Sequence, residues 1–146
     1  MKFFLAILIF YINLTNAYSI ETKIIHKIQN EIITNVDIKN EFKYLLALNN
    51  DLKELNREKI LSISNDSIIR EKIKKIEVIK NFKELKVDNT YLDTLIKNTY
   101  LKLGLKSKEE FNLYLKDYKL TLSDVEGKLT IDALWNQLIY EKYNSQ

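Results

Sequence analysis

The fold is decided by residues 24–38, whose sequence is IIHKIQNEIITNVDI. Two short runs rich in β-branched residues flank Gln29 and Asn30, and asparagine tolerates the positive φ of a tight turn. This pattern predicts a small β-hairpin that ends at Thr34 and leads into a helix, with Asp37 near the start of that helix. Because two strands of this length are only marginally stable alone, we expect the hairpin to lie against helices.

The chain beyond Thr34 is predicted to be helical, because its apolar residues recur every three or four positions. Small polar residues at 64–67 predict a break between a short and a long helix. Capping patterns at Asp88, Ser107–Glu110 and Thr121–Asp124 predict the starts of the last three helices. The expected helices cover residues 36–49, 54–62, 66–85, 89–103 (ended by Gly104), 107–118 and from 121 toward the C-terminus. The fold class is therefore mainly α, a short N-terminal β-hairpin followed by a bundle of about five helices.

Composition excludes several classes of site. The chain has 146 residues, which fits one domain, and 46% hydrophobic with 29% charged residues is typical of a globular protein. There is no cysteine and one histidine, His26, so no metal site built on these ligands is expected. The two glycines, Gly104 and Gly127, cannot form a glycine-rich phosphate loop. A net charge of +3 gives no indication of a nucleic-acid partner.

Residues 1–17 are predicted to be a secretory signal peptide. Lys2 supplies a positive charge, residues 3–12 form an apolar run, and Thr15-Asn16-Ala17 is a small-x-small cleavage pattern. The apolar run is too short to cross a bilayer, which needs about 20 residues. We therefore expect export, cleavage after Ala17 and a domain that comprises residues 18–146.

The charged side chains are interpreted as structural. Arg70, Lys72, Lys74, Lys75 and Lys80 form a basic face on the predicted long helix that we interpret as solvated. Three pairs of acidic residues lie at predicted helix starts: Asp37/Glu41, Glu109/Glu110 and Asp124/Glu126. We interpret them as stabilising the positive end of the helix dipole, and we do not interpret them as catalytic acid–base pairs. The sequence thus predicts no catalytic residue, no metal and no cofactor.

The last helix carries more apolar residues than one buried stripe requires. A protein that holds other polypeptides needs accessible apolar surface, and tyrosine suits this contact because it is amphipathic and loses little side-chain entropy. The alternative is ordinary core packing, the usual role of large apolar residues at helical spacing. The candidate polypeptide-contact residues are Leu134, Trp135, Leu138, Ile139, Tyr140 and Tyr143.

The order of these segments is similar to that of a known family. The segments concerned are the hairpin ending in Glu31-x-Ile33-Thr34, Val87-Asp88 with Leu92-Asp93, Ser107-x-x-Glu110-Phe111, Leu120-Thr121-x-x-Asp124-Val125 and residues 133–139, ALWNQLI. Together they resemble the N-terminal domain of the SurA-type periplasmic chaperones, which belong with the parvulin-type prolyl isomerases. The resemblance covers about Lys23 to Tyr143. It departs from the family at Lys119 and at Lys83 or Glu84, where glycines are usual, and at residues 74–77, which lack the usual acidic signature.

The resemblance implies a periplasmic chaperone module that binds unfolded outer-membrane polypeptides through an apolar groove, with no cofactor and no nucleic acid. In that family the chain continues into parvulin domains, and no such segment is recognisable up to Gln146. Isomerase activity is therefore expected only if a parvulin domain follows in the full gene. The family also packs a later C-terminal helix on this module, so we expect an open apolar face here that attracts a client or a second copy, as a homodimer. Two alternatives stay open: a truncated front end of a prolyl isomerase, and an envelope protein with one fixed partner.

Overall fold

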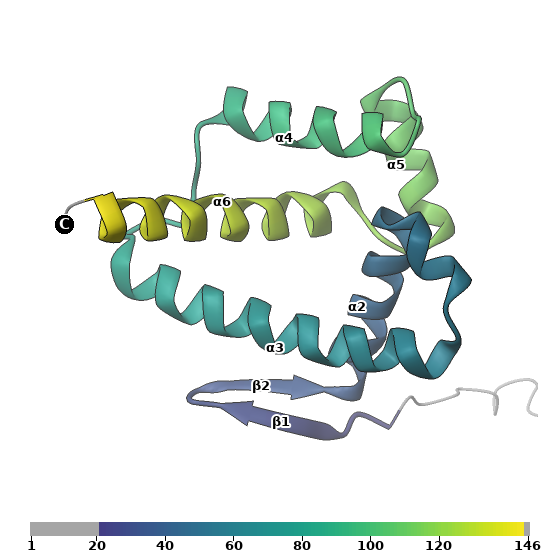
Figure 1. The fold of residues 1–146 in the computed structure, drawn as a ribbon, viewed down its shortest axis with the longest axis horizontal. Coiled ribbons are helices and arrows are strands. Elements are labelled where there is room, and N and C mark those ends of the chain that lie inside the picture. Colours follow the sequence, from purple (N-terminus) through teal and green to yellow (C-terminus); the bar gives the residue numbers. More distant parts are fainter. Residues whose placement is uncertain (1–20, 145–146) are drawn as a thin grey trace, which may run out of the picture.

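The computed structural model describes residues 21–144, in which an antiparallel two-stranded hairpin is followed by five α-helices and one short 3-10 helix (Figure 1). The predicted fold class is confirmed. The signal peptide predicted at residues 1–17 lies outside the described residues. The elements are β1 (Ile24–Ile28), β2 (Glu31–Thr34), α2 (Asn35–Leu48), η1 (Asn50–Glu54), α3 (Arg57–Asn81), α4 (Asn89–Lys102), α5 (Lys108–Asp117) and α6 (Leu122–Asn144).

The elements form a stack with α6 near its centre. The hairpin lies along α3, α3 packs against α6, and α4 lies along the other side of α6, while α2 and α5 close one end (Figure 1). The helices α3 and α6 run in the same direction and α4 runs opposite to them (Figure 1). Because α6 has a helix on either side, a wide band of its surface is buried.

The hairpin has one fully buried apolar residue and contacts α3 through polar side chains. Ile33 is fully buried. The Nε2 atom of His26 lies 2.7 Å from Oδ1 of Asn65 on α3, and Lys72 donates to Glu31 at 2.8 Å. This confirms that the hairpin lies against a helix. The residue with positive φ in its turn is Gln29 (52°).

The predicted break at residues 64–67 is wrong, because α3 runs without interruption from Arg57 to Asn81. Its small polar side chains bond to their surroundings instead of capping a new helix. The buried Ser64 donates to the carbonyl of Ile60 at 2.7 Å, one turn earlier. The Ser67 hydroxyl donates to Glu41 of α2 at 2.7 Å. The interruption between helices lies earlier in the sequence, around η1, and α3 ends at Asn81, four residues before the predicted end at residue 85.

The predicted caps are confirmed. Asp88 accepts from the backbone of Tyr91 at 3.1 Å, and Thr121 and Asp124 form a reciprocal capping box. Ser107 accepts from the backbone of Glu110, whose carboxylate in turn accepts from the backbone N–H of residue 106 at 2.7 Å. These local bonds set where α4, α5 and α6 begin.

Two helices end in the same hydrogen-bonded motif with different residues at its left-handed position. After α4, Gly104 has a φ of 78°, and the N–H of Leu105 donates back to the carbonyl of Tyr100. After α5, Lys119 has a φ of 58°, and the N–H of Leu120 donates to the carbonyl of Leu115 in the equivalent way. The left-handed conformation suits glycine and strains a lysine.

Two clusters of buried apolar side chains hold the helices together. One joins α2, α4, α5 and α6 around the fully buried Phe111 and Leu115. The other lies where α3 meets α6 and contains Val78, Ile131 and Leu134. Because α6 contributes to both clusters, it is the helix on which the rest of the domain is assembled.

Candidate functional site

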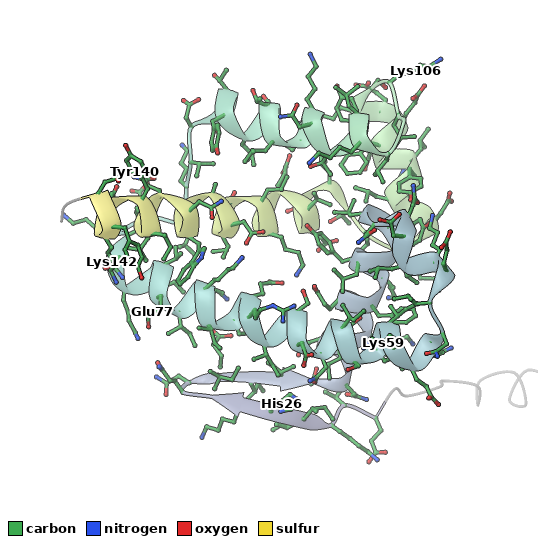
Figure 2. All side chains as sticks on the ribbon, viewed as in Figure 1. His26, Lys59, Glu77, Lys106, Tyr140 and Lys142 are labelled. Carbon is green, nitrogen blue, oxygen red and sulfur yellow. The ribbon has the colours of Figure 1, made fainter. Side chains whose placement is uncertain are left out.

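A groove lies between the start of α4 and the C-terminal half of α6, with a volume of about 510 Å³. We call it the α4–α6 groove. Its deeper lining includes the half-buried Val87 and the buried Ala133, whereas Tyr91 and Tyr140 are exposed at 50% and 69%. Figure 2 shows Tyr140 projecting from the end of α6 on the side that faces α4. Apolar lining with phenol rings at its edge can hold an apolar or aromatic side chain.

The groove also contains amide side chains. Asn136 and Gln137 of α6 line it and are exposed to solvent, and Gln137 donates to Glu141 at 2.8 Å. An amide both donates and accepts hydrogen bonds, so it can pair with the N–H or the C=O of an extended peptide. The groove therefore offers apolar contact together with backbone-type hydrogen bonding.

The structure divides the six predicted contact residues between core and surface. Leu134 and Leu138 are buried, and Trp135 and Ile139 are half-buried, with Trp135 packed on the cluster between α3 and α6. Tyr140 and Tyr143 are the exposed ones, at 69% and 70%. Of the six, Tyr140 alone lines the groove, which is completed by residues that the sequence did not single out: Tyr91, Ala133, Asn136 and Gln137.

A second hollow, of about 310 Å³, lies on the other side of α6 against α3. Leu85, exposed at 43%, and Ile131 supply its apolar lining, and Glu71 and Lys75 supply charges. Gly127 also lines it, so α6 presents bare backbone to this hollow. Accessible apolar surface thus lies on both sides of α6.

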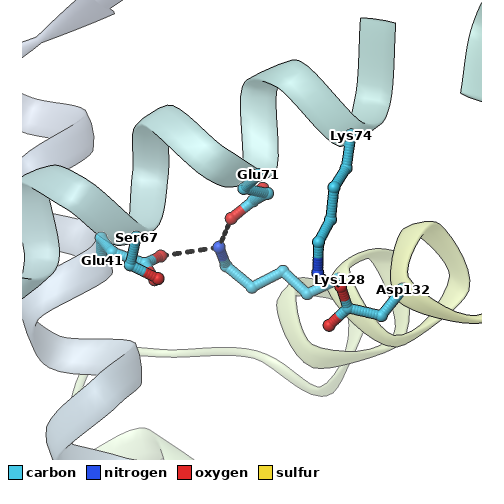
Figure 3. Close-up of polar contacts among 6 residues, drawn as sticks. All are labelled: Glu41, Ser67, Glu71, Lys74, Lys128 and Asp132. Atoms are coloured by element: carbon cyan, nitrogen blue, oxygen red, sulfur yellow. Dashed lines mark hydrogen bonds and ion pairs between the residues drawn. The ribbon is translucent and has the colours of Figure 1, made fainter. Parts of the chain in front are cut away.

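A cluster of ion pairs lies where α2, α3 and α6 meet (Figure 3). Glu41 of α2 is buried, with 3% of the residue exposed. Its carboxylate accepts from Lys128 of α6 at 2.6 Å and from Ser67 of α3 at 2.7 Å. Lys128 pairs with Glu71 of α3 as well. One ammonium group therefore ties α6 to two other helices through buried or partly buried charges.

The surroundings of this cluster are polar and fully paired. Lys74 bonds to Asp132 at 2.6 Å, and the Lys128 ammonium lies 4.7 Å from the ring centre of Tyr44. Burial, and then the negative charges of Glu41 and Asp132, raise the pKa of the Tyr44 hydroxyl above its ordinary value. Because each carboxylate in the cluster already has a cation, and the tyrosine is held protonated, the arrangement favours a structural role over acid–base chemistry.

The interpretation of the basic face of α3 as merely solvated is wrong for most of its lysines. Lys72 and Lys75 pair with Glu31 of the hairpin, at 2.8 and 3.8 Å, and Lys80 pairs with Glu77 at 2.6 Å. Lys74 pairs with α6, as described above. The partners of Lys72, Lys74 and Lys75 come from other elements, so no sequence pattern links them, whereas Lys80 and Glu77 are three residues apart on α3 itself.

No group of three or more histidine, aspartate or glutamate side chains in residues 21–144 is arranged to hold a metal ion, and His26 bonds to Asn65. None of the helices in this part of the chain combines the length and apolarity needed to span a membrane.

No protein-family model matches the chain, and no characterised protein and no solved structure shows significant similarity to it. The resemblance to the SurA-type chaperones therefore stays a prediction from the residues named for it.

Proposed function

We propose that this protein is a periplasmic chaperone module that holds unfolded outer-membrane polypeptides on the C-terminal half of α6. The observation that carries the proposal is a pair of exposed tyrosines in the last turns of α6: Tyr140, 69% exposed, lines the α4–α6 groove, and Tyr143, 70% exposed, follows three residues later. Single exposed aromatic side chains need no explanation, but two of them about one turn apart beside a groove form accessible apolar surface that a partner can cover. The client chemistry implied is an extended chain with apolar and aromatic side chains, such as a β-barrel strand before insertion.

The energetics favour reversible binding. If a fully buried tyrosine hides about 200 Å² and each of the two tyrosines has about 70% of this to lose, a client can cover roughly 280 Å². At 25 cal/mol per Å² this is about 7 kcal/mol before the costs of association, which are of the same order. The net affinity of the two tyrosines for a client is therefore weak unless the groove contributes too. Weak binding suits this function, because a protein that holds clients also has to release them.

The test is aggregation of an unfolded outer-membrane β-barrel protein, followed by light scattering with the present protein at equimolar concentration. We expect the wild type to suppress scattering, and Tyr140→Ser/Tyr143→Ser to suppress it clearly less. Leu113→Ser is a matched control, because Leu113 is 63% exposed on α5 and lies outside the groove. All three proteins should keep the same far-UV circular dichroism and urea midpoint, since the substituted side chains are exposed.

Two outcomes would contradict the proposal. One is no suppression by the wild type. The other is an equal loss in the tyrosine and Leu113 variants, which would indicate non-specific stickiness. Binding to one folded envelope protein with no effect on unfolded chains would favour the fixed-partner alternative instead.

A further inference from the structure

Three lysines line a hollow at the opposite end of the molecule from the C-terminal tyrosines (Figure 1). Lys39 and Lys43 lie one turn apart on α2, and Lys119 faces the same hollow from the connection between α5 and α6. Tyr118 and Asp117 complete a lining that encloses about 420 Å³. We call this the lysine hollow. The charges that line it sum to a net positive value, with one aspartate against three lysines.

Within the described residues, these lysines differ from Lys72, Lys74 and Lys80 of α3 in having no carboxylate partner. Lys72, Lys74 and Lys80 all form ion pairs, at 2.6 to 2.8 Å. Within residues 21–144, neither Lys39 nor Lys119 forms one, and the contact of Lys43 is with the neutral side chain of Asn40, at 3.1 Å. Like charges gathered without counter-ions repel each other, so the hollow gains from an added anion.

The backbone at Lys119 is the second observation. Its φ of 58° places it in the left-handed region, in the same helix-ending motif that uses Gly104 after α4. Glycine would adopt this conformation without strain, whereas a lysine adopts it at a cost. The motif therefore does not explain the lysine, and its side chain lines the hollow. Strain that persists where a side chain faces a site points to a role for that side chain.

We propose that the lysine hollow binds carboxylates of an acidic polypeptide segment. Lysine ammonium groups are compact charges on flexible stems, so they can follow carboxylates at variable positions along a chain. Asp117 on the same wall repels the headgroups of a uniformly anionic membrane surface. Carboxylate side chains spaced along a chain can enter the hollow and avoid Asp117.

The experiment uses the full protein and a fluorescently labelled peptide of alternating glutamate and serine, with a lysine–serine peptide as the opposite-charge probe. Fluorescence anisotropy at low and at physiological salt measures binding. We expect the acidic peptide to bind and the lysine–serine peptide not to bind. Binding of the acidic peptide should be weaker at the higher salt concentration. Lys39→Gln/Lys43→Gln should weaken binding roughly fivefold, from two partly exposed ion pairs. The acidic peptide has no aromatic residue. If it does not bind, the proposal for the lysine hollow fails, and the proposed binding of clients by Tyr140 and Tyr143 is not affected.

Lys119→Gly separates a binding role from a structural one. It should weaken peptide binding roughly threefold and at the same time raise the urea midpoint, since it removes a charge and relieves the strained backbone. A lysine kept only for the fold would give no loss of binding.

Lys97→Gln/Lys102→Gln is the matched control, because it removes the same charge from two exposed lysines of one helix, α4, outside the hollow. It should leave binding almost unchanged. The proposal is overturned if the control weakens binding as much as the hollow variant, if the wild type does not bind the acidic peptide, or if the same lysines are needed for anionic vesicles and not for the peptide.

Discussion

Replacing Lys128 by methionine tests whether the ion cluster holds α6 to the other helices. Methionine keeps much of the length and apolar stem of lysine and removes the charge. The side chain of Glu41 is only 2% exposed, so in the variant it is left with the Ser67 hydroxyl, at 2.7 Å, as its remaining partner. Glu71 is 28% exposed and can turn toward water. The cost therefore arises at Glu41.

Two routes give the size of that cost. Removing one partner of a buried ion pair typically costs about 3–5 kcal/mol. The variant can instead protonate Glu41, which at pH 7 costs an ordinary glutamate about 3.7 kcal/mol, from 2.7 pH units at 1.36 kcal/mol each. The cost of protonation is an upper limit on the penalty for the unpaired charge, because the variant adopts whichever of the two states has the lower free energy. We expect the free energy of unfolding to fall by about 3–4 kcal/mol at pH 7.

The assay is urea unfolding of the wild type and Lys128→Met at pH 7 and pH 5. If the variant folds with Glu41 protonated, its folded state binds a proton that its unfolded state lacks. Lowering the pH then stabilises it relative to the wild type, and the deficit should shrink by up to about 2.7 kcal/mol between pH 7 and pH 5. The wild type, in which the Glu41 carboxylate accepts from Lys128 at 2.6 Å, is the reference at both pH values.

Two further variants make the result interpretable. Lys80→Met breaks the exposed pair between Lys80 and Glu77 on α3 and should leave the urea midpoint unchanged. Adding Glu41→Gln to Lys128→Met removes the buried charge and should recover much of the loss. The reasoning is refuted if Lys128→Met loses less than about 1 kcal/mol, or if its deficit is the same at both pH values.

Two other predictions concern stability. A hydrogen bond from Lys72, and then the charges of Lys72 and Lys75, lower the pKa of Glu31 below its ordinary value of 4.5. The stability that the ionised Glu31 adds to the fold is therefore fully present above pH 4.5. It is lost as the pH falls through the lower pKa that Glu31 has in the folded protein. Glu31→Gln should cost less than about 1 kcal/mol at pH 7, since the pair is partly exposed, and the difference from wild type in urea midpoint should shrink as the pH is lowered below 4.5. Gly127→Ala should raise the thermal midpoint in calorimetry by about 4 °C, from about 1 kcal/mol of helix propensity, because the added methyl group meets no atom within 4 Å; a fall in the midpoint would refute this.

The correct parts of the sequence prediction rest on local interactions. The caps at Asp88, Ser107 and Thr121 each involve residues three or four positions apart, so their partners are visible in the sequence itself. The break predicted at Ser64–Ser67 failed for the opposite reason. The partner of Ser67 is Glu41, 26 positions away, and a polar residue satisfied by such a contact has no need to cap a helix.

Helical periodicity could not separate the buried from the exposed residues of α6. It identifies one apolar stripe, whereas α6 is covered by α3 on one side and α4 on another, so which residues stay exposed depends on where those neighbours end. Leu134 and Leu138 lie within the covered length. Tyr140 lies toward the end of α6, which extends beyond the start of α4 (Figure 1). The position of that start follows from the Asp88 cap, a feature of a different segment of the chain.

These contacts give the two halves of α6 different roles. Its first half is held by Val125 and Ile131 in the core and by Lys128 and Asp132 in ion pairs to α2 and α3. Its second half, from Trp135 on, ends with two tyrosines that face solvent, Tyr140 and Tyr143. A partner that covers those tyrosines adds contacts without having to displace any that the fold depends on. Binding at this end and stability at the other can therefore vary independently, which is why the tyrosine variants should lose client binding at unchanged urea midpoint while Lys128→Met loses stability.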